Sequence, residues 1–284
     1  MNGAALLGLA ATERDIEKFR LSERVKLQVA AGLSPALDAA LIFGGDGTVH
    51  RYLPQLRQHR IPALVVPKGS GNDFAKALGI ASEKVALEAW KQYCHGGKNV
   101  REIDLGVIRS GEKEIPFCCV AGTGMDAEAN ALANRMPAWL RGSAGYLIAA
   151  LGALARFEPV EFAVSSARRE IRRSAFFAAV GNAHRYGHGM KVAPQALIDD
   201  GLLDVCLVGK MNKLKLLCSV PTIFFGAHLR IRQVEYVQTP EVRIESRRPL
   251  PVYADGEYAC HTPVEIKVLP AALRLIVPAG PDPE

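Results

Sequence analysis

The chain has 284 residues, about the length of two average domains or one large one. Apolar residues make up 49% and charged residues 23%, which excludes wholesale disorder. The net charge of +6 (35 − 29) is too small for an obligate nucleic-acid binder, so we expect no nucleic-acid partner. The six cysteines form no C-x-x-C pair, and no apolar run reaches the roughly 18 residues of a bilayer span, so we predict a cytoplasmic protein without a transmembrane segment.

The first hundred residues show the alternation of an α/β domain. Ala39–Phe43 and Ala63–Val66 are short, continuous apolar runs, as expected of parallel strands that are covered on both faces. A glycine-bearing loop follows each run. Helices are predicted over Asp73–Leu78 and over Glu83–Tyr93, which end at glycines.

From about Val100 the pattern changes to short β-like runs separated by turns, as in an antiparallel sandwich. Two helical stretches interrupt it. One covers 128–157 and is broken by Pro137 and Gly142, and the other covers 212–220 and starts at a capping residue, Asn212. The sequence therefore predicts an α/β domain followed by a β-sandwich domain, with a boundary near residues 97–105. The expected strands contain REIDLGVI, IPFCCVAG, VEFAV, IRRSAFFAAV, LLDVCLV, VEYVQ, EVRIES, VEIKVL and LRLIV.

Two glycine-rich loops follow the first two predicted strands. Gly44-Gly45-Asp46-Gly47-Thr48 lets the backbone approach phosphate oxygens closely, although Asp46 would repel bare phosphate unless a magnesium ion intervenes. A tight turn that needs glycines explains this pentapeptide equally well. Lys68–Asp73 adds the Ser70 hydroxyl and a helix N-terminus, where Asn72 or Asp73 could simply be caps. Two such loops at one sheet edge favour a phosphate site.

Two acidic clusters lie in the second half. Asp255 and Glu257 flank a glycine and would point to one side of an extended stretch, with Glu257 as a proton acceptor and Asp255 as its partner. A β-turn with solvated acids is the simpler interpretation from spacing alone. Asp199 and Asp200 precede Gly201, where they could cap a turn or hold a hard cation.

Arginines gather at two further places, Arg168–Arg173 and Arg243–Arg248. A solvated hairpin face explains them, and attraction to anionic lipid head groups is the sharper alternative.

Taken together, these stretches resemble the diacylglycerol kinase catalytic domain family, in particular the soluble bacterial lipid kinases related to sphingosine and ceramide kinases. The resemblance runs in order from about residue 38 to residue 278. It is carried by GGDGTVH (44–50), VPKGSGNDFAKALGI (66–80), IDLG (103–106), AGTGMDAEA (121–129), APQALIDDGLLDV (193–205), ADGEY (254–258) and LPAALRLIVP (269–278).

The resemblance implies a phosphofructokinase-like α/β nucleotide domain over 1–100, a β-sandwich over 101–269, and a last strand, 270–278, that returns to the first domain. It implies an ATP- and Mg²⁺-dependent lipid kinase that phosphorylates diacylglycerol or a similar lipid in a cleft between the domains, at the inner face of the membrane. The sequence leaves open whether the protein forms a homodimer. The apolar helix Ser143–Phe157 could lie near the lipid tails, but core packing is the preferred explanation for it.

The resemblance also implies roles for single residues. Asp46 and Asp255 join Glu257, the base that activates the lipid hydroxyl, as catalytic candidates. A structural magnesium ion would be held by the Asp200 carboxylate and the backbone carbonyls of Leu197 and Leu202. The implied ATP site consists of Gly44, Gly45, Asp46, Gly47, Thr48, Val49, His50 and Ser70.

The sequence departs from the family pattern at its start. Family members begin with a strand and an N-P-x-S-G-type loop, and residues 1–38 contain no such loop. GGDGT at residue 44 is too early to leave room for a whole first strand, helix and second strand, so we expect an abbreviated nucleotide domain. Arg51 also stands where the family usually has Glu. A catalytically impaired lipid-binding protein and a kinase of the NAD kinase type stay open as alternatives.

Overall fold

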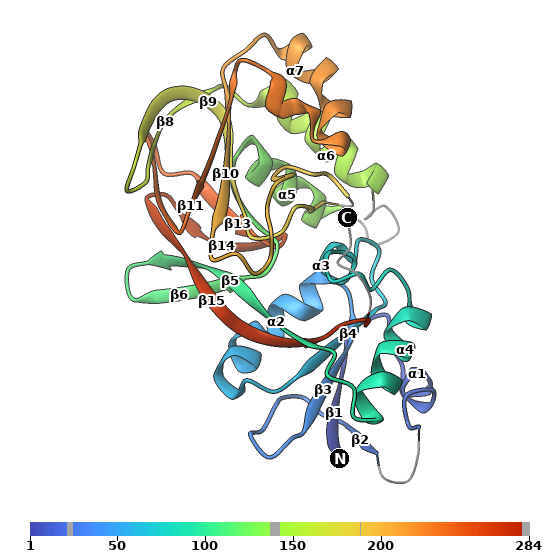
Figure 1. Ribbon diagram of the computed structural model, residues 1–284. Helices are drawn as coiled ribbons and strands as arrows, with labels where there is room; N and C mark the ends of the chain where they lie inside the picture. Colours follow the sequence, from blue (N-terminus) through green and yellow to red (C-terminus); the bar gives the residue numbers. More distant parts are fainter. Residues whose placement is uncertain (22–24, 137–142, 188, 280–284) are drawn as a thin grey trace. The chain divides into compact units, whose positions relative to one another are not determined.

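The computed structural model describes residues 1–21, 25–136, 143–187 and 189–279 (Figure 1). The chain forms two compact units. The first consists of Met1–Leu105 and the chain from Pro270 onward, and the second is Gly106–Leu269. The predicted change of texture near residues 97–105 is where the first unit ends. The predicted fold class, an α/β domain followed by a β-rich domain, is confirmed.

The first unit is built on a parallel sheet with the strand order β4-β3-β1-β2. Every residue of β3 is buried, which is why its sequence is a continuous apolar run. From the end of the chain, Leu275 pairs in parallel with Ala63 of β4. The bounds of these strands are β1 Asn2–Leu7, β2 Lys26–Val29, β3 Ala39–Gly44 and β4 Ala63–Pro67.

Four helices accompany this sheet: α1 Glu13–Glu17, α2 Asp46–His59, α3 Asp73–Ala77 and α4 Glu83–Cys94. The predicted helices over 73–78 and 83–93 are confirmed as α3 and α4. Large side chains fill the core: Phe19 meets Phe43 edge to face at 5.1 Å, and the Trp90 indole N–H donates to the Phe19 carbonyl at 2.9 Å. This buried hydrogen bond satisfies the one polar atom of Trp90.

The expectation that the start of the chain has no room for a strand, a helix and a second strand is wrong. β1, α1 and β2 all precede β3, and β1 lies between β2 and β3 in the sheet. They fit because α1 has five residues and β2 has four. The apolar run Ala4–Leu7, followed by Gly8, is the local signal that could have indicated the first strand.

In the second unit the strands pair antiparallel. β7, β8, β9, β12 and β13 form the centre, with β14 on β13 and β10 between β9 and β11. Chain reversals at close intervals explain why the sequence showed short runs separated by turns. The bounds are β5 Val100–Ser110, β6 Lys113–Phe117, β7 Val120–Gly124, β8 Val160–Ser165, β9 Glu170–Gly181, β10 Leu203–Gly209, β11 Val234–Thr239, β12 Glu241–Ser246, β13 Pro251–Ala254, β14 Glu257–His261 and β15 Val264–Ile276.

Two predictions about these strands need correction. IPFCCVAG was expected to be one strand, but it is divided between β6 and β7, because the chain bends at Cys118 and Cys119, whose N–H groups bond to Asp255. VEIKVL and LRLIV were expected to be separate strands, but both belong to β15. Ala271, directly after Pro270, has a φ of 49°, so the chain bends there without ending the strand. The residue pattern suggested a break because Pro removes a backbone donor.

The helical segments of the second unit are α5 Met125–Arg135, α6 Ser143–Arg156, α7 Lys213–Ser219 and the 3₁₀ turns η2 Val220–Phe225 and η3 Ala227–Arg230. The predicted cap is confirmed, since the Asn212 side chain accepts a hydrogen bond from the Leu214 N–H at 2.8 Å. The predicted helix breakers Pro137 and Gly142 lie outside the described residues. In the described part of the chain, no helix is both long enough and apolar enough to cross a bilayer.

Candidate active site

The two glycine-rich loops of the first unit touch each other. A Cβ atom on Gly69 would lie 2.6 Å from the Cα of Gly45, so the backbones pass with no space for a side chain. The Lys68 N–H also donates to the Gly44 carbonyl at 3.0 Å. The expected meeting of the loops after β3 and β4 is therefore confirmed, at the carboxyl end of parallel strands where ligands bind in open α/β folds.

A third loop, after β1, joins them. The Gly8 N–H donates to the Phe43 carbonyl at 2.8 Å, and a Cβ atom on Gly8 would lie 2.5 Å from Oγ1 of Thr48. The sequence analysis missed this loop because it lacks the family's usual residues. Its place after the first strand makes it the third wall of the same site.

Asp46 lies at the first residue of α2, and its carboxylate reaches another helix. Its two oxygens accept the N–H groups of Asp73 at 3.1 Å and of Phe74 at 3.0 Å, the first residues of α3. Asn72 is the N-cap residue of that helix by position, as predicted, but its side chain bonds to the backbone of Gly69, so the Asp46 carboxylate accepts the first N–H groups of α3 in its place. An acidic group between two helix N-termini is in a favourable field.

The other residues of the predicted ATP site have separate positions. Gly45 is the N-cap of α2, and Asp46 to His50 form its first turn, so this stretch is helical where a loop was expected. The Val49 side chain is buried in the core, and its N–H bonds to the Gly45 carbonyl. Ser70 and Arg51 are exposed. Backbone amides, the Thr48 and Ser70 hydroxyls and a helix N-terminus are thus close together, which suits phosphate oxygens.

Lys68, in the second loop, is held by two carboxylates. Its ammonium lies 2.7 Å from Asp15 and 2.5 Å from Glu83. The hydrogen bond from Lys68 lowers the pKa of Asp15 to about 2, and bonds to Asp15 and Glu83 raise the pKa of Lys68 against the opposing effect of burial. This cation fixes α1, the loop and α4 to one another.

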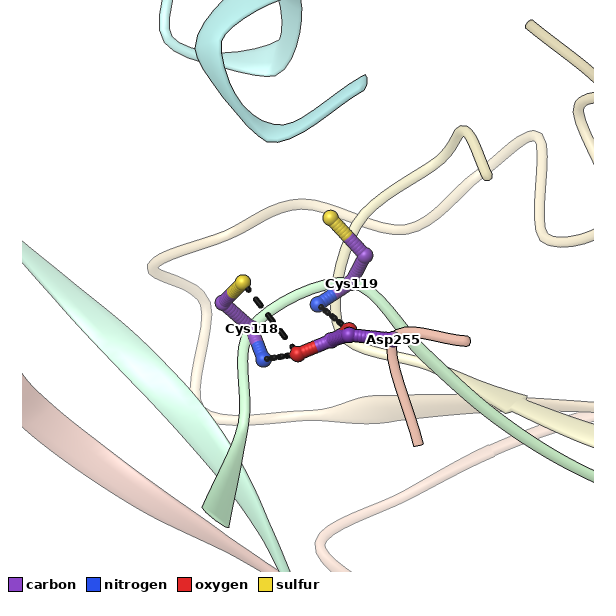
Figure 2. A group of neighbouring side chains, drawn as sticks. All are labelled: Cys118, Cys119 and Asp255. Atoms are coloured by element: carbon purple, nitrogen blue, oxygen red, sulfur yellow. Dashed lines mark hydrogen bonds between the residues drawn. The ribbon is translucent and has the colours of Figure 1, made fainter. Parts of the chain in front are cut away.

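In the second unit, Asp255 and Gly256 form the two-residue turn between β13 and β14. Their φ angles of 50° and 87° and the pairing of Ala254 with Glu257 are those of a type I′ hairpin. The expectation of an extended stretch with both acids on one side is therefore wrong. The alternative, a β-turn with solvated acids, is right about the turn and about Glu257, which is exposed, but not about Asp255, whose carboxylate is engaged. The Asp255 carboxylate accepts the backbone N–H groups of Cys118 (2.9 Å), Cys119 (2.8 Å) and Val120 (3.2 Å), as Figure 2 shows for the two cysteines.

This clamp has two consequences. It fixes the turn that carries Glu257, whose side chain is exposed at the start of β14. It also explains why the Cys118 and Cys119 thiols and the Asp255 carboxylate come within 4.8 Å of one another. The carboxylate is engaged by backbone amides, so we interpret the group as a structural clamp and not as a metal centre.

The predicted magnesium-binding stretch forms an exposed turn before β10. Oδ1 of Asp200 accepts the Leu202 N–H at 3.0 Å, and Gly201 has a φ of 73°. Leu197 is 58% exposed. A carboxylate beside backbone carbonyls is the oxygen donor set that hard cations prefer, so the chemistry of these residues fits Mg²⁺.

A largely apolar cavity of about 110 Å³ lies inside the second unit, among α5, α6, α7 and η2. Its polar lining includes Asp126, which accepts a hydrogen bond from the Tyr186 hydroxyl at 2.5 Å, and His228, whose pKa burial lowers. Ala150, Leu151 and Leu154 of α6 line it as well, so α6 does more than fill the core. Asp126, Tyr186 and His228 are far apart in the sequence, so no local pattern indicated that they line one cavity.

Solved structures share the fold of this chain. The chain superposes on a putative diacylglycerol kinase from Bacillus anthracis str. Sterne with a TM-score of 0.77 at 20% identity, covering 99% of this chain and 95% of that one. An NAD kinase from Archaeoglobus fulgidus, solved in complex with ATP, gives a TM-score of 0.59 at 13% identity, with 98% and 94% covered. At these identities the similarity shows the fold alone.

Sequence comparisons go further. The family model of the diacylglycerol kinase catalytic domain matches residues 6–108, and that of the YegS C-terminal NAD kinase beta sandwich-like domain matches residues 119–277. A diacylglycerol kinase of Mycobacterium tuberculosis is 36% identical over 258 residues, covering 88% of this chain and 80% of that protein. A probable YegS-like lipid kinase of Chromohalobacter salexigens is 31% identical over 249 residues, with 84% and 75% covered. The chain therefore belongs to the family of diacylglycerol kinases and YegS-like lipid kinases, and it is a kinase.

Proposed function

We propose that this protein transfers the γ-phosphoryl group of ATP, with Mg²⁺, to the hydroxyl group of diacylglycerol or a similar lipid. The observation that carries the proposal is the contact between the glycine loops after β3 and β4, with Asp46 between two helix N-termini. A backbone approach this close, at the carboxyl end of parallel strands, suits the polyphosphate of a nucleotide.

Gly44, Gly45, Thr48 and Ser70 hold the phosphates in this proposal. Because Asp46 already accepts two backbone N–H groups, its negative charge is partly offset. Mg²⁺ bound with the nucleotide neutralises charge on the phosphate oxygens. The family model that matches residues 6–108 supports the same placement.

Glu257 is the proposed base. Its position directly after a two-residue turn leaves the carboxylate exposed, while Asp255 fixes the turn through three backbone amides. The carboxylate takes the proton of the lipid hydroxyl as that oxygen attacks the γ-phosphorus, and the bond from phosphorus to the bridging oxygen breaks. Asp255 is a positioning residue.

The cavity in the second unit is the proposed site of an acyl chain. Its lining is almost wholly apolar, and Asp126 with Tyr186 supplies one polar end for a glycerol or ester group. Asp200, with the carbonyls of Leu197 and Leu202, holds the proposed structural Mg²⁺. The proposed location is the cytoplasmic side of the membrane, where such a lipid is reached from water.

The test uses radiolabelled ATP and mixed micelles that contain diacylglycerol, a ceramide or no lipid acceptor, with NAD in a parallel reaction. Wild type should label diacylglycerol, and Glu257→Ala should lower kcat about 10²- to 10⁴-fold. Asp46→Ala should lower kcat/KM for ATP, and chelation of Mg²⁺ should abolish turnover. Glu257→Asp is the matched control, because it keeps a base and should retain more activity than Glu257→Ala.

Two results would overturn the proposal. Labelling of NAD and of no lipid would establish a kinase of the NAD kinase type. Binding of lipid without turnover would establish the impaired protein, an alternative that rested on a missing first loop. Residues 2–29 do form the strand, helix and strand, but the loop after β1 has no N-P-x-S-G-type sequence, so the assay decides between the two.

A further inference from the structure

Helix α7 is apolar on both sides. Leu216 faces inward and is buried, whereas Leu214 and Leu217, three residues apart and therefore on one face, are 68% and 39% exposed. α7 also carries Lys213 and Lys215, and an exposed apolar face beside basic residues is typical of a helix that is covered by protein or by lipid. Exposure of the outward leucines of α7 to water is thus energetically unfavourable.

Exposed apolar side chains continue into η2. Phe224 and Phe225 are 44% and 82% exposed. Helix α6, which lies beside α7 in Figure 1, adds the exposed side chains of Ile148 and Leu151. Six of the ten large apolar side chains that are exposed in the described part of the chain therefore belong to α6, α7 and η2.

Basic residues flank these side chains in the sequence. The thirty residues from Val205 to Val234 contain no aspartate or glutamate. Of the five basic residues in that stretch, Lys213 pairs with Glu158 at 2.8 Å. The other four are exposed and form no ion pair within the described part of the chain: Lys210, Lys215, Arg230 and Arg232.

The arginine clusters that the sequence singled out differ in this respect. Arg169 and Arg173 both pair with Glu235 at 3.0 Å, and Arg172 pairs with Glu170 at 2.6 Å. In the second cluster, Arg243 pairs with Glu245 at 2.7 Å. Neighbouring acids thus offset much of the charge of these clusters, so they attract an anionic surface less strongly than their sequence suggests.

We infer that the outward side of α6, α7 and η2, here called the α7 face, docks onto an anionic lipid bilayer. Phe224, Phe225, Leu214 and Leu217 enter the boundary between head groups and acyl chains, and the four exposed cations contact anionic head groups. A second copy of the chain is disfavoured as the occupant, because two such faces would bring like charges together.

The inference rests on the proposed function, because docking would bring the cavity, the proposed acyl-chain site, to the membrane from which the lipid comes. The same segment faces both ways: Leu216, Val220 and Ile223 line the cavity, while Leu214 and Phe225 point outward. Docking by this face would place the wall of the proposed acyl-chain site at the membrane.

Sedimentation with vesicles tests the docking directly. Wild type should bind phosphatidylcholine vesicles that contain phosphatidylglycerol, and bind pure phosphatidylcholine weakly. Phe225→Ser should weaken binding about tenfold or more, and Lys210→Gln with Lys215→Gln about 30-fold at low salt. The matched controls are Val29→Ser, another exposed apolar residue, and Arg168→Gln with Arg172→Gln, which should bind like wild type.

A second measurement reports insertion without relying on loss of binding. Phe225→Trp should be quenched by vesicles with brominated acyl chains more strongly than the tryptophans of wild type. Equal quenching would overturn insertion by η2.

Activity separates this inference from the proposed function. Phe225→Ser should lose turnover on diacylglycerol in vesicles and keep wild-type turnover on a short-chain diacylglycerol dissolved as monomers. If wild type phosphorylates the monomeric lipid but Phe225→Ser and the lysine variant bind vesicles like wild type, the docking inference is wrong and the proposed function stands. If wild type phosphorylates neither lipid while vesicle binding depends on Phe225 and the lysines, the kinase proposal fails and docking stands.

The oligomeric state tests the other possible occupant of the α7 face, a second copy of the chain. If wild type is a dimer that Phe225→Ser dissociates, and vesicle binding is unchanged, the face belongs to a second copy and the docking inference is wrong.

Discussion

Asp255 holds two distant parts of the chain together through one carboxylate. Its oxygens accept three backbone N–H groups from residues 118–120, and its own N–H donates to the Val120 carbonyl at 3.0 Å. Backbone donors that lose their acceptor in a half-buried site are costly. The residue is thus as important for the position of Glu257 as for stability.

We expect Asp255→Ala to lower the free energy of unfolding by about 2–3 kcal/mol, because it leaves these backbone N–H groups without an acceptor. Urea denaturation measures the change. Asp255→Asn keeps one carbonyl acceptor and should lose about half as much. Equal losses for both variants would contradict the assignment of the carboxylate as a multiple acceptor.

Asp15 gives stability a defined pH dependence. Its bond to Lys68, together with the Thr12 N–H, lowers its pKa from 3.8 to about 2 in the folded protein. A carboxylate with a depressed folded-state pKa stabilises the protein above its unfolded-state pKa, and this contribution is lost as the pH falls from about 4 toward about 2.

Asp15→Asn should therefore cost about 1 kcal/mol at pH 7 and progressively less below pH 4. Unfolding of both proteins at pH values from 7 to 2 measures the difference. Glu17→Gln on the same helix, an exposed residue that pairs only with Arg20 among the described residues, is the control and should show a small difference throughout. A difference for Asp15→Asn that does not shrink in acid would refute the link.

At the scale of the element, the β13–β14 hairpin depends on Gly256. Its φ of 87° is unfavourable for residues with a Cβ atom, yet the nearest heavy atom to such an atom would be 4.0 Å away, in the Asn130 side chain. Any cost of a substitution therefore comes from the backbone and not from crowding.

Gly256→Ala should lower stability by about 1 kcal/mol and lower kcat more than it raises KM for ATP, because the turn aims Glu257. Steady-state kinetics with the urea midpoint measure both effects. Gly256→Asn is the control, since Asn tolerates a positive φ better and should retain more activity. Wild-type kcat in Gly256→Ala would show that the turn does not position the base.

Several elements were predictable because their causes are local. The buried run of β3, the cap at Asn212 and the Asp-Gly turn each depend on residues within a few positions of one another. β2 was missed because it has four residues, one of them buried, and is specified by its pairing with β1. β1 carries a local apolar run, Ala4–Leu7, that could have indicated a strand.

At the scale of the whole molecule, nucleotide binding should stabilise the folded chain. If ATP with Mg²⁺ binds the loops after β1, β3 and β4, a nucleotide concentration 100 times Kd adds about 2.7 kcal/mol to the free energy of unfolding. Thermal unfolding with and without the nucleotide measures this. Asp46→Ala should show a smaller shift, and ATP with a chelator should show little. An unchanged Tm for wild type at saturating ATP and Mg²⁺ would contradict the assignment of these loops as a nucleotide site.

The sequence by itself determined the two textures of the chain, elements such as β3, β4, α3 and α4, and the motifs that carry the resemblance to lipid kinases. Composition, periodicity and turn chemistry are sufficient for these, because each acts over a few residues. The resemblance to lipid kinases also indicated the site residues Gly44 to His50, Ser70 and Glu257, whose roles stay predictions.

Only the tertiary structure decided which groups meet. Asp46 caps a helix 27 residues further along, Asp255 binds amides 135 or more residues earlier, and α6 and α7 enclose a cavity while exposing apolar side chains to the outside. The physical reason is that hydrogen-bond partners and burial are set by the path of the chain between distant segments. That path is invisible to patterns read over a few residues.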